Sequence, residues 1–266
     1  MPKLALLAAL LVVPACHGHA AHHAAPTAAP LTEVNIAVPI APGKTAAWQA
    51  ALEELLGPRY AEYDASRRRY GVTSQTTFLQ QTPMGDFAVI HMTGPDVRAS
   101  FHAMSTSQDP WDVKWRALTL NLHGMDFAKG ERVTPQVEPA YEMDSGDAGT
   151  ARPFMFVAPL APEGVARFRA LAAELMGARH DDYVRARRRL GIHRETVILE
   201  TTAMGAAAVF YWLADDPQAS LDQLATSTDP FDVALRADAG RAHPLPIDAI
   251  AAIAAHNALV GQYPHE

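Results

Sequence analysis

The fold is decided by a stretch that occurs twice in the chain. Residues 106–113 read Thr106-Ser107-Gln108-Asp109-Pro110-Trp111-Asp112-Val113, and residues 226–233 read Thr226-Ser227-Thr228-Asp229-Pro230-Phe231-Asp232-Val233. The same shift of 120 residues aligns Arg67-Arg68-Arg69 with Arg187-Arg188-Arg189 and His123 with His243, without an insertion. Roughly a third of the aligned positions are identical, which composition alone does not produce. The chain is therefore an internal duplication of one structural unit.

Each unit begins with a strand and a long helix. A short apolar run at residues 34–40, repeated in the second copy, ends in Ala-Pro and predicts a first strand. Apolar residues then recur at helical spacing over residues 42–69 and in their copy. Gly57-Pro58 should bend or break the first of these helices, whereas Gly177-Ala178 need not break the second.

The arginine triplets fall in the last turn of these helices. Cations there complement the negative end of the helix dipole, and Gly71 suits a left-handed cap just beyond the helix. An anion-binding site is the alternative interpretation. The dipole disfavours it, because that helix end attracts the cation itself.

A hairpin and a further helix complete each unit. Residues 72–92 predict two strands that turn at Pro83-Met84-Gly85-Asp86. Asp109-Pro110 is a good N-cap and first-turn pair for a helix, and a short last strand is expected around residues 125–127. The resulting order, β-α-β-β-α-β, is the ferredoxin-like arrangement.

The third strands, Phe87 to Met92 and Ala207 to Leu213, are apolar on both of their alternating faces. A sheet with one wet face would alternate, so the face without helices must also be covered. The second repeat is the natural cover. The predicted fold class is α+β, with two tandem ferredoxin-like repeats packed sheet to sheet.

The chain at this point resembles the dimeric α+β barrel superfamily, in which two ferredoxin-like units pack sheet to sheet. That superfamily includes the antibiotic biosynthesis monooxygenases, EthD-like proteins and chlorite dismutases. The stretch Leu79 to Asp86, together with Asp109-Pro110-Trp111-Asp112, is similar to bacterial members of this group. The resemblance implies an intrachain version of the barrel. It assigns no catalytic residue.

Composition excludes several classes of function. The formal net charge is -7, so no diffuse positive field is available to gather the phosphates of a nucleic acid. The single cysteine, Cys16, forms neither an internal disulfide nor a cysteine-built zinc site. There is no Gly-rich phosphate loop, zinc-protease helix motif or nucleophile elbow in the sequence.

The N-terminus predicts export. Lys3 precedes an apolar run of signal-peptide length, and Val13-Pro14-Ala15-Cys16 resembles a bacterial lipobox, although Pro14 departs from its usual small residue. The mature protein is expected to begin at a lipidated Cys16 and to reach the membrane through that anchor. Simple secretion to the periplasm or medium is the alternative.

The predicted organisation of the chain follows from these features. It comprises a signal peptide (1–15), a disordered His/Ala/Pro tether (16–32), repeat 1 (33–130), a linker (131–152), repeat 2 (153–250), and a C-terminal helix and tail (251–266). The tether carries four histidines that could chelate a divalent metal, and a polar spacer is the alternative interpretation: His17, His19, His22 and His23.

Candidate site residues come from the face of the hairpin that should point between the two sheets. A turn of two or four residues predicts the pairs Gln80 with Val89 and Phe78 with His91, and the same pairs in the second copy. A mostly apolar hollow with a few polar groups is typical of a small-molecule site. The expected lining residues are Phe78, Gln80, His91, Ile198, Glu200 and Tyr211.

Three of these residues could do chemistry. Burial should raise the pKa of Glu200, and Tyr211 is predicted on its diagonal, so the two could position or deprotonate a phenol-like substrate. A satisfied polar pair is the alternative. His91 could be a general base or a haem ligand, or simply a hydrogen-bonded core histidine.

The first functional hypothesis is an exported, lipid-anchored protein that binds a small apolar or aromatic ligand between its two repeats. A cofactor-independent monooxygenase-type enzyme and a haem-binding barrel are the alternatives, and whether the protein is an enzyme stays open. No cofactor is required by the first hypothesis.

Overall fold

The structure is a computed structural model that describes residues 30–126, 136–146, 148–203 and 205–264. Its elements are listed here in chain order: β1 (Glu33–Pro39), α1 (Thr45–Leu56), α2 (Tyr60–Arg69), β2 (Ser74–Thr82), β3 (Gly85–Thr93), α3 (Val97–Thr106), α4 (Pro110–His123), β4 (Gln136–Asp144), β5 (Arg152–Leu160), α5 (Gly164–Met176), α6 (His180–Arg189), β6 (Ile192–Thr202), β7 (Gly205–Ala214), α7 (Pro217–Thr226), α8 (Pro230–Ala242), α9 (Ile247–Ala254) and β8 (Ala258–Tyr263).

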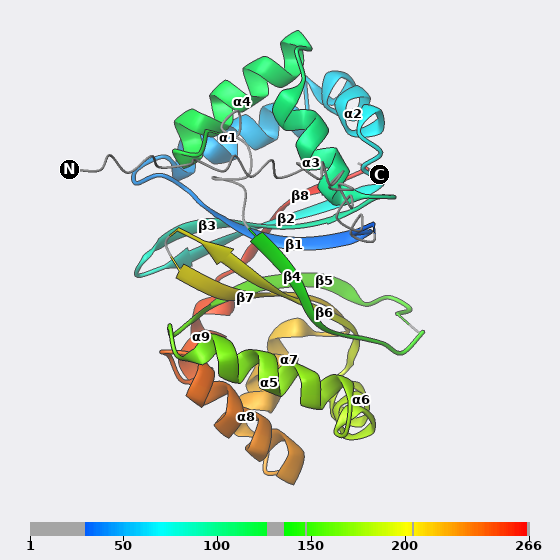
Figure 1. The fold of residues 1–266 in the computed structure, drawn as a ribbon, viewed down its shortest axis with the longest axis vertical. Coiled ribbons are helices and arrows are strands. Elements are labelled where there is room, and N and C mark those ends of the chain that lie inside the picture. The colour runs from blue at the N-terminus through cyan, green and yellow to red at the C-terminus, as the bar shows by residue number, and fades with distance from the viewer. Residues whose placement is uncertain (1–29, 127–135, 147, 204, 265–266) are drawn as a thin grey trace, which may run out of the picture.

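Two antiparallel sheets lie face to face between two layers of helices (Figure 1). The first sheet has the order β1-β3-β2-β8 and is covered by α1 to α4, and the second has the order β4-β6-β7-β5 and is covered by α5 to α9. Helices on one face and a second sheet on the other explain why the central strands are apolar on both faces. The predicted fold, an α+β barrel built from two ferredoxin-like repeats in one chain, is confirmed.

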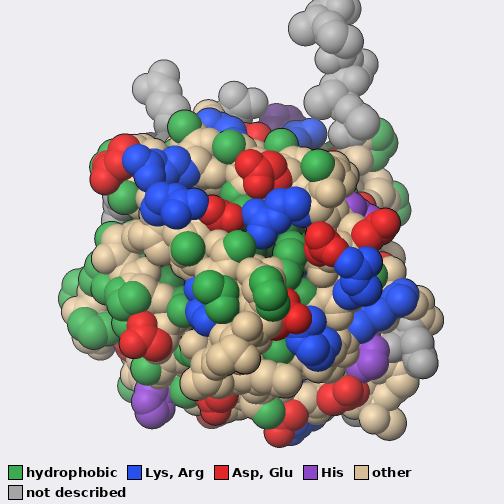
Figure 2. Space-filling model, turned by 90° about the horizontal axis from the view of Figure 1, so that it is seen from below, with side chains coloured by type: hydrophobic (Ala, Val, Ile, Leu, Met, Phe, Trp, Pro, Cys, Tyr) green, Lys and Arg blue, Asp and Glu red, His purple; other side chains and the backbone are tan. Residues whose placement is uncertain are grey.

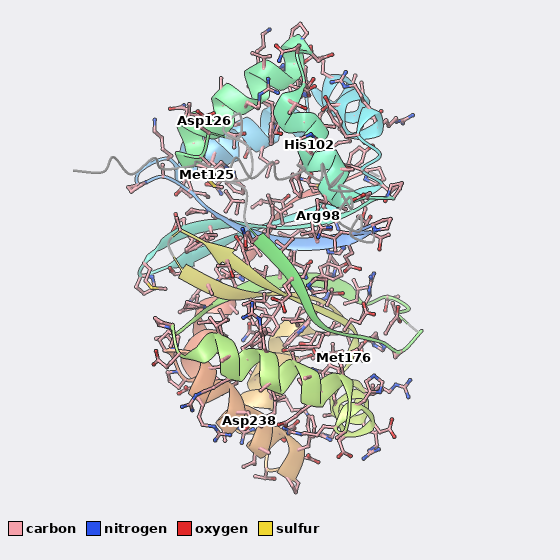
Figure 3. The ribbon with its side chains drawn as sticks, viewed as in Figure 1. Arg98, His102, Met125, Asp126, Met176 and Asp238 are labelled. Atoms are coloured by element: carbon pink, nitrogen blue, oxygen red, sulfur yellow. The ribbon has the colours of Figure 1, made fainter. Side chains whose placement is uncertain are left out.

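Each repeat gives its last strand to the other repeat. β4 follows the helices of the first repeat but pairs with β6, whereas β8 follows the helices of the second repeat and pairs with β2. The short strand expected at residues 125–127 was wrong, because Met125 and Asp126 lie outside any strand just beyond α4 (Figure 3), and Phe127 is outside the described residues. The stretches predicted as a linker and a C-terminal tail instead contain β4 and β8.

The long helix of each unit is broken at the same point. Gly57 separates α1 from α2, as predicted, and Gly177 separates α5 from α6, where the sequence did not require a break. A Cβ would lie 2.9 Å from the Glu53 carbonyl oxygen at Gly57 and 3.0 Å from the Ala173 carbonyl oxygen at Gly177. The break therefore depends on glycine in both copies, and the neighbouring proline is not needed.

The hairpin register differs from the prediction by two residues. Gln80 lies opposite Phe87, and Phe78 lies opposite Val89, because the loop between β2 and β3 contains only Pro83 and Met84. The second hairpin shows the same shift, with Glu200 opposite Ala207. A shift of two leaves every side chain on its predicted face, since side chains alternate with a period of two residues.

Side chains from the two repeats interdigitate between the sheets. Phe78 and Val89 belong to the apolar cluster of the second repeat, and Ile198 belongs to that of the first. Among the described residues, no helix is both long enough and apolar enough to span a bilayer.

The outward face formed by the helices of the second repeat carries interspersed basic and acidic side chains (Figure 2). This mixture resembles a solvated protein surface and offers no continuous basic path on that face.

Candidate functional site

The six residues predicted from the sequence lie between the two sheets as three pairs related by the 120-residue shift. These pairs are Phe78 with Ile198, Gln80 with Glu200, and His91 with Tyr211. Their side chains are buried in contacts with the opposite repeat rather than around a described cavity. The Phe78 ring, for example, meets the edge of Phe154 at a centroid distance of 5.9 Å.

Gln80 and Glu200 bind the edge strand of the opposite sheet. Gln80 donates from Nε2 to the Val157 carbonyl (2.9 Å), and its Oε1 accepts from the Val157 N–H (2.8 Å). The Glu200 carboxyl accepts from the Ala37 N–H (2.7 Å). Ala37 and Val157 lie on β1 and β5, which are edge strands of the two sheets in the part of the chain that the structure describes. These contacts satisfy buried peptide groups and join the sheets.

His91 and Tyr211 are stacked on each other, with ring centroids 3.7 Å apart and ring planes at 10°. Burial lowers the pKa of His91 to about 3, so the imidazole is neutral. Its Nδ1 donates to Asn35 Oδ1 at 2.9 Å, because the Asn35 amide nitrogen donates elsewhere, to the Thr196 carbonyl. With one face against Tyr211 and 3% of the residue exposed, His91 does not fit the role of axial haem ligand.

The proposed Glu200–Tyr211 pair is not brought together. Glu200 pairs with Ala207, whereas Tyr211 pairs with Thr196, so the two residues are separated by four positions along the hairpin. At about 3.3 Å per residue this places their backbones on the order of 13 Å apart. The structure thus separates the two groups that the sequence interpretation had combined as an acid–base pair.

The other predicted sites lie outside the described residues. These are the lipidation site Cys16 and the tether histidines His17, His19, His22 and His23. Within the part of the chain that the structure describes, no three His, Cys, Asp or Glu residues are grouped as metal ligands.

The first repeat contains an apolar cavity of about 110 Å³ between its sheet and its helices. Ile36, Ile90 and Met92 form its floor on the sheet, and Trp48 and Trp115 approach from α1 and α4. This volume is comparable to that of an apolar cavity that accepts one benzene ring, about 150 Å³. The cavity lies on the opposite face of the sheet from the predicted hollow.

Most of the residues that line this cavity are apolar, and three of its polar side chains carry ionisable groups. Arg67, the first member of the arginine triplet, is only 3% exposed. Tyr63 lies on the same helix, and burial raises the pKa of its phenol, which therefore stays protonated as a donor. His123 bonds through Nδ1 to the Pro39 carbonyl, and burial lowers its pKa, so Nε2 carries no proton in the neutral ring.

The equivalent cavity of the second repeat is smaller, about 50 Å³. Three sheet residues that correspond to Ile36, Ile90 and Met92 are replaced there by aromatic rings: Phe156, Phe210 and Trp212. The two phenyl rings stack at 4.4 Å, and the Trp212 ring meets Phe156 edge-on at 5.2 Å. Aromatic packing has therefore filled most of the space that the first repeat keeps.

The polar groups also differ between the two copies. Glu195 in the second repeat is fully buried and accepts hydrogen bonds from Tyr183 (2.7 Å), Arg187 (2.5 Å) and Trp212 (2.7 Å). In the first repeat the same strand position is occupied by Gln75. The second repeat thus holds a closed ion pair, whereas the first holds an arginine beside a neutral amide.

Sequence reasoning named an anion site at the arginine triplet only as the alternative, because the end of a helix dipole favours a cation, and it did not predict the cavity beside Arg67. A signal was present. The two copies carry the same Tyr and Arg, but glutamine replaces glutamate eight residues after the arginine, and Met92 replaces the tryptophan that binds that glutamate.

The chain is similar to solved structures. The crystal structure of "Putative monooxygenase" from Fusobacterium nucleatum subsp. nucleatum is 12% identical, with a TM-score of 0.44 over 79% of this chain and 87% of that chain. An anthrone oxidase-like protein is 16% identical, with a TM-score of 0.45 over 82% of this chain and 85% of that chain. No family model and no curated protein sequence matches the chain.

Proposed function

We propose that the first repeat binds a small apolar or aromatic molecule in the cavity between its sheet and its helices. The observation that supports this function is the difference between the two copies of one fold. The first copy keeps about 110 Å³ open beneath its helices, and the second, with larger aromatic side chains at the same sheet positions, keeps about 50 Å³.

An unfilled cavity has a cost in stability. At about 24 cal/mol per Å³, the larger cavity corresponds to a loss on the order of 2–3 kcal/mol. The aromatic side chains of the second repeat show that the same backbone can hold larger residues that fill most of this space. A cavity that is retained at this cost, and that is lined by apolar groups with a few polar ones, is typical of a ligand site.

The test uses benzamide, a neutral single-ring compound, and the full chain. Benzamide should bind, as measured by calorimetry and by a change in the fluorescence of Trp48 and Trp115. Ile90→Phe, which copies Phe210 of the second repeat, should fill the cavity and abolish binding while leaving the thermal midpoint unchanged or higher. Ile90→Leu is the volume-matched control and should bind normally. Benzamide binding that is unaffected by Ile90→Phe would place the ligand elsewhere.

An enzyme of the cofactor-independent monooxygenase type is the second candidate function. His123 favours it, because its Nδ1 donates to the Pro39 carbonyl, which makes Nε2 of this cavity-lining ring the proton acceptor for a bound phenol-like molecule. His243 makes the same bond to Pro159 in the second repeat and is the matched control. Oxygen uptake with phenolic compounds should be lost in His123→Gln and retained in His243→Gln if this function holds.

We also propose that this ligand-binding protein acts outside the cytoplasm, attached to the membrane through a lipid on Cys16. The support is the sequence of the first sixteen residues, which resembles a lipoprotein signal.

A further inference from the structure

Arg67 is a buried cation without a carboxylate partner among the residues that the structure describes. It is 3% exposed and lies in the last turn of α2. Its Nη1 approaches Gln75 Oε1 at 3.4 Å, and its Nη2 approaches the sulfur of Met104 at 3.2 Å. Its Nε is buried with no hydrogen-bond partner. A guanidinium stays charged in proteins, so this position holds a positive charge that is poorly compensated.

The second repeat shows what compensates the same arginine. Arg187 is equally buried, and its Nε donates to Glu195 Oε2 at 2.5 Å. The Tyr183 hydroxyl donates to the same oxygen, and Trp212 Nε1 donates to Oε1. The Glu195 carboxylate therefore occupies a site formed by a tyrosine and an arginine of α6 and a residue of β7.

The backbone that forms this site is the same in both copies. Gln75 on β2 lies opposite Met92 on β3, just as Glu195 on β6 lies opposite Trp212 on β7. Tyr63 and Arg67 are spaced on α2 as Tyr183 and Arg187 are on α6. The first repeat thus keeps the tyrosine and arginine but lacks the carboxylate.

The buried guanidinium of Arg67 lines the cavity, beside the neutral Gln75 amide. Arg67, Tyr63 and Gln75 all line the same 110 Å³ space as the apolar residues of the floor. The guanidinium lies on the ring faces of Tyr63 and Trp115, with its central carbon 5.0 and 5.8 Å from their centroids. These contacts leave Nε, the atom that binds Glu195 in the other copy, without a partner.

We propose that the first-repeat cavity selects a small aromatic or apolar monocarboxylate, whose carboxylate binds the buried guanidinium of Arg67 beside the neutral Gln75 amide, which holds the position of Glu195. This assignment rests on the proposed function, since it names the class of ligand for the same cavity. The apolar body of the ligand lies against Trp48 and Ile90, and its charge compensates the buried guanidinium.

The experiment compares benzoate with benzamide, which differ mainly in charge, on the full chain in chloride-free buffer. Benzoate should bind about ten- to hundred-fold more tightly, as expected for hydrogen bonds to a charged group. Gln75→Glu restores the internal carboxylate of the second repeat and should abolish the preference for benzoate while raising the thermal midpoint. Arg68→Gln removes the neighbouring, exposed arginine of the triplet and should leave both affinities unchanged.

The outcomes separate the two proposals. Equal affinities for benzoate and benzamide in the wild-type chain, or benzoate binding that survives Gln75→Glu, would overturn the carboxylate assignment and leave the cavity as a neutral site. Displacement of benzoate by equimolar chloride would also overturn it, because an inorganic anion would then satisfy the arginine. Binding of neither compound would overturn the proposed function together with this assignment.

Discussion

Gln80 and Glu200 make equivalent contacts from opposite sheets. Gln80 exchanges two hydrogen bonds with the backbone of Val157 on β5, and Glu200 accepts one from the backbone of Ala37 on β1. Glu200 Oε1 is buried without a partner. A proton on that oxygen would let the carboxyl imitate the amide of Gln80, and burial raises the pKa of Glu200 to about 8, which favours the protonated form. Glu200 is thus a structural group at the sheet interface.

Glu200→Gln should therefore stabilise the protein at alkaline pH. The pKa of Glu200 in the folded protein, about 8, lies above the ordinary value of 4.5. The contribution of Glu200 to the free energy of unfolding is therefore fully present below pH 4.5 and is lost as pH rises toward 8. Glutamine does not ionise, so the free energy of unfolding of the variant should exceed that of the wild type by on the order of a few kcal/mol at pH 8 and by little at pH 5. Urea unfolding at the two pH values checks this. A large loss of stability at pH 5 would contradict it.

Glu195→Gln should have the opposite effect. Glu195 is bound by Arg187, Tyr183 and Trp212 in a fully buried site. Removing its charge leaves Arg187 buried and unpaired, which should lower the free energy of unfolding by about 3–5 kcal/mol. Urea unfolding at pH 7 measures this, with Glu200→Gln as the matched control for a buried glutamate. A loss below about 1 kcal/mol would show that the pair is not a major source of stability.

The two repeats should not fold separately. A fragment that ends at Arg132 contains β1, β2 and β3 but lacks β8, which completes the first sheet, and it exposes the apolar face that packs on the second sheet. A fragment of residues 31–132 should dimerise or aggregate in size-exclusion chromatography. A stable monomeric fragment would argue against a shared core.

Cys16→Ser should release the protein from the membrane. If Cys16 carries the lipid, the wild-type protein should partition into detergent when expressed in a bacterium with lipoprotein processing, and the variant should stay in the aqueous phase. Phase separation in detergent followed by immunoblotting measures this. Identical partitioning of the two forms would remove the lipid anchor from the proposed function.

Local patterns in the sequence determined the duplication, the order of elements and the face on which each hairpin residue lies. Gln80 and His91 could be placed between the sheets because the alternation of strand side chains is a local property, which survives even a register error of two residues. The candidate roles did not follow as readily. Whether buried side chains enclose a ligand or bind each other depends on the distance between the two sheets. The periodicity of apolar residues in the sequence gives no information on that distance.

Only the tertiary structure decided which strands complete each sheet and which groups meet under the helices. β4 and β8 each pair with the sheet of the opposite repeat. The sequence pattern does not contain this pairing, because the sheet edge that each strand joins is built from residues far away along the chain. The difference between Gln75 and Glu195 is visible in the sequence. Its consequence depends on the tertiary structure, which brings the arginine at the end of the helix to the start of the following strand. Arg67 there contacts the Gln75 amide, and Arg187 contacts the Glu195 carboxylate. A buried charge is compensated by whatever lies within a few ångströms of it, and that neighbourhood is set by packing.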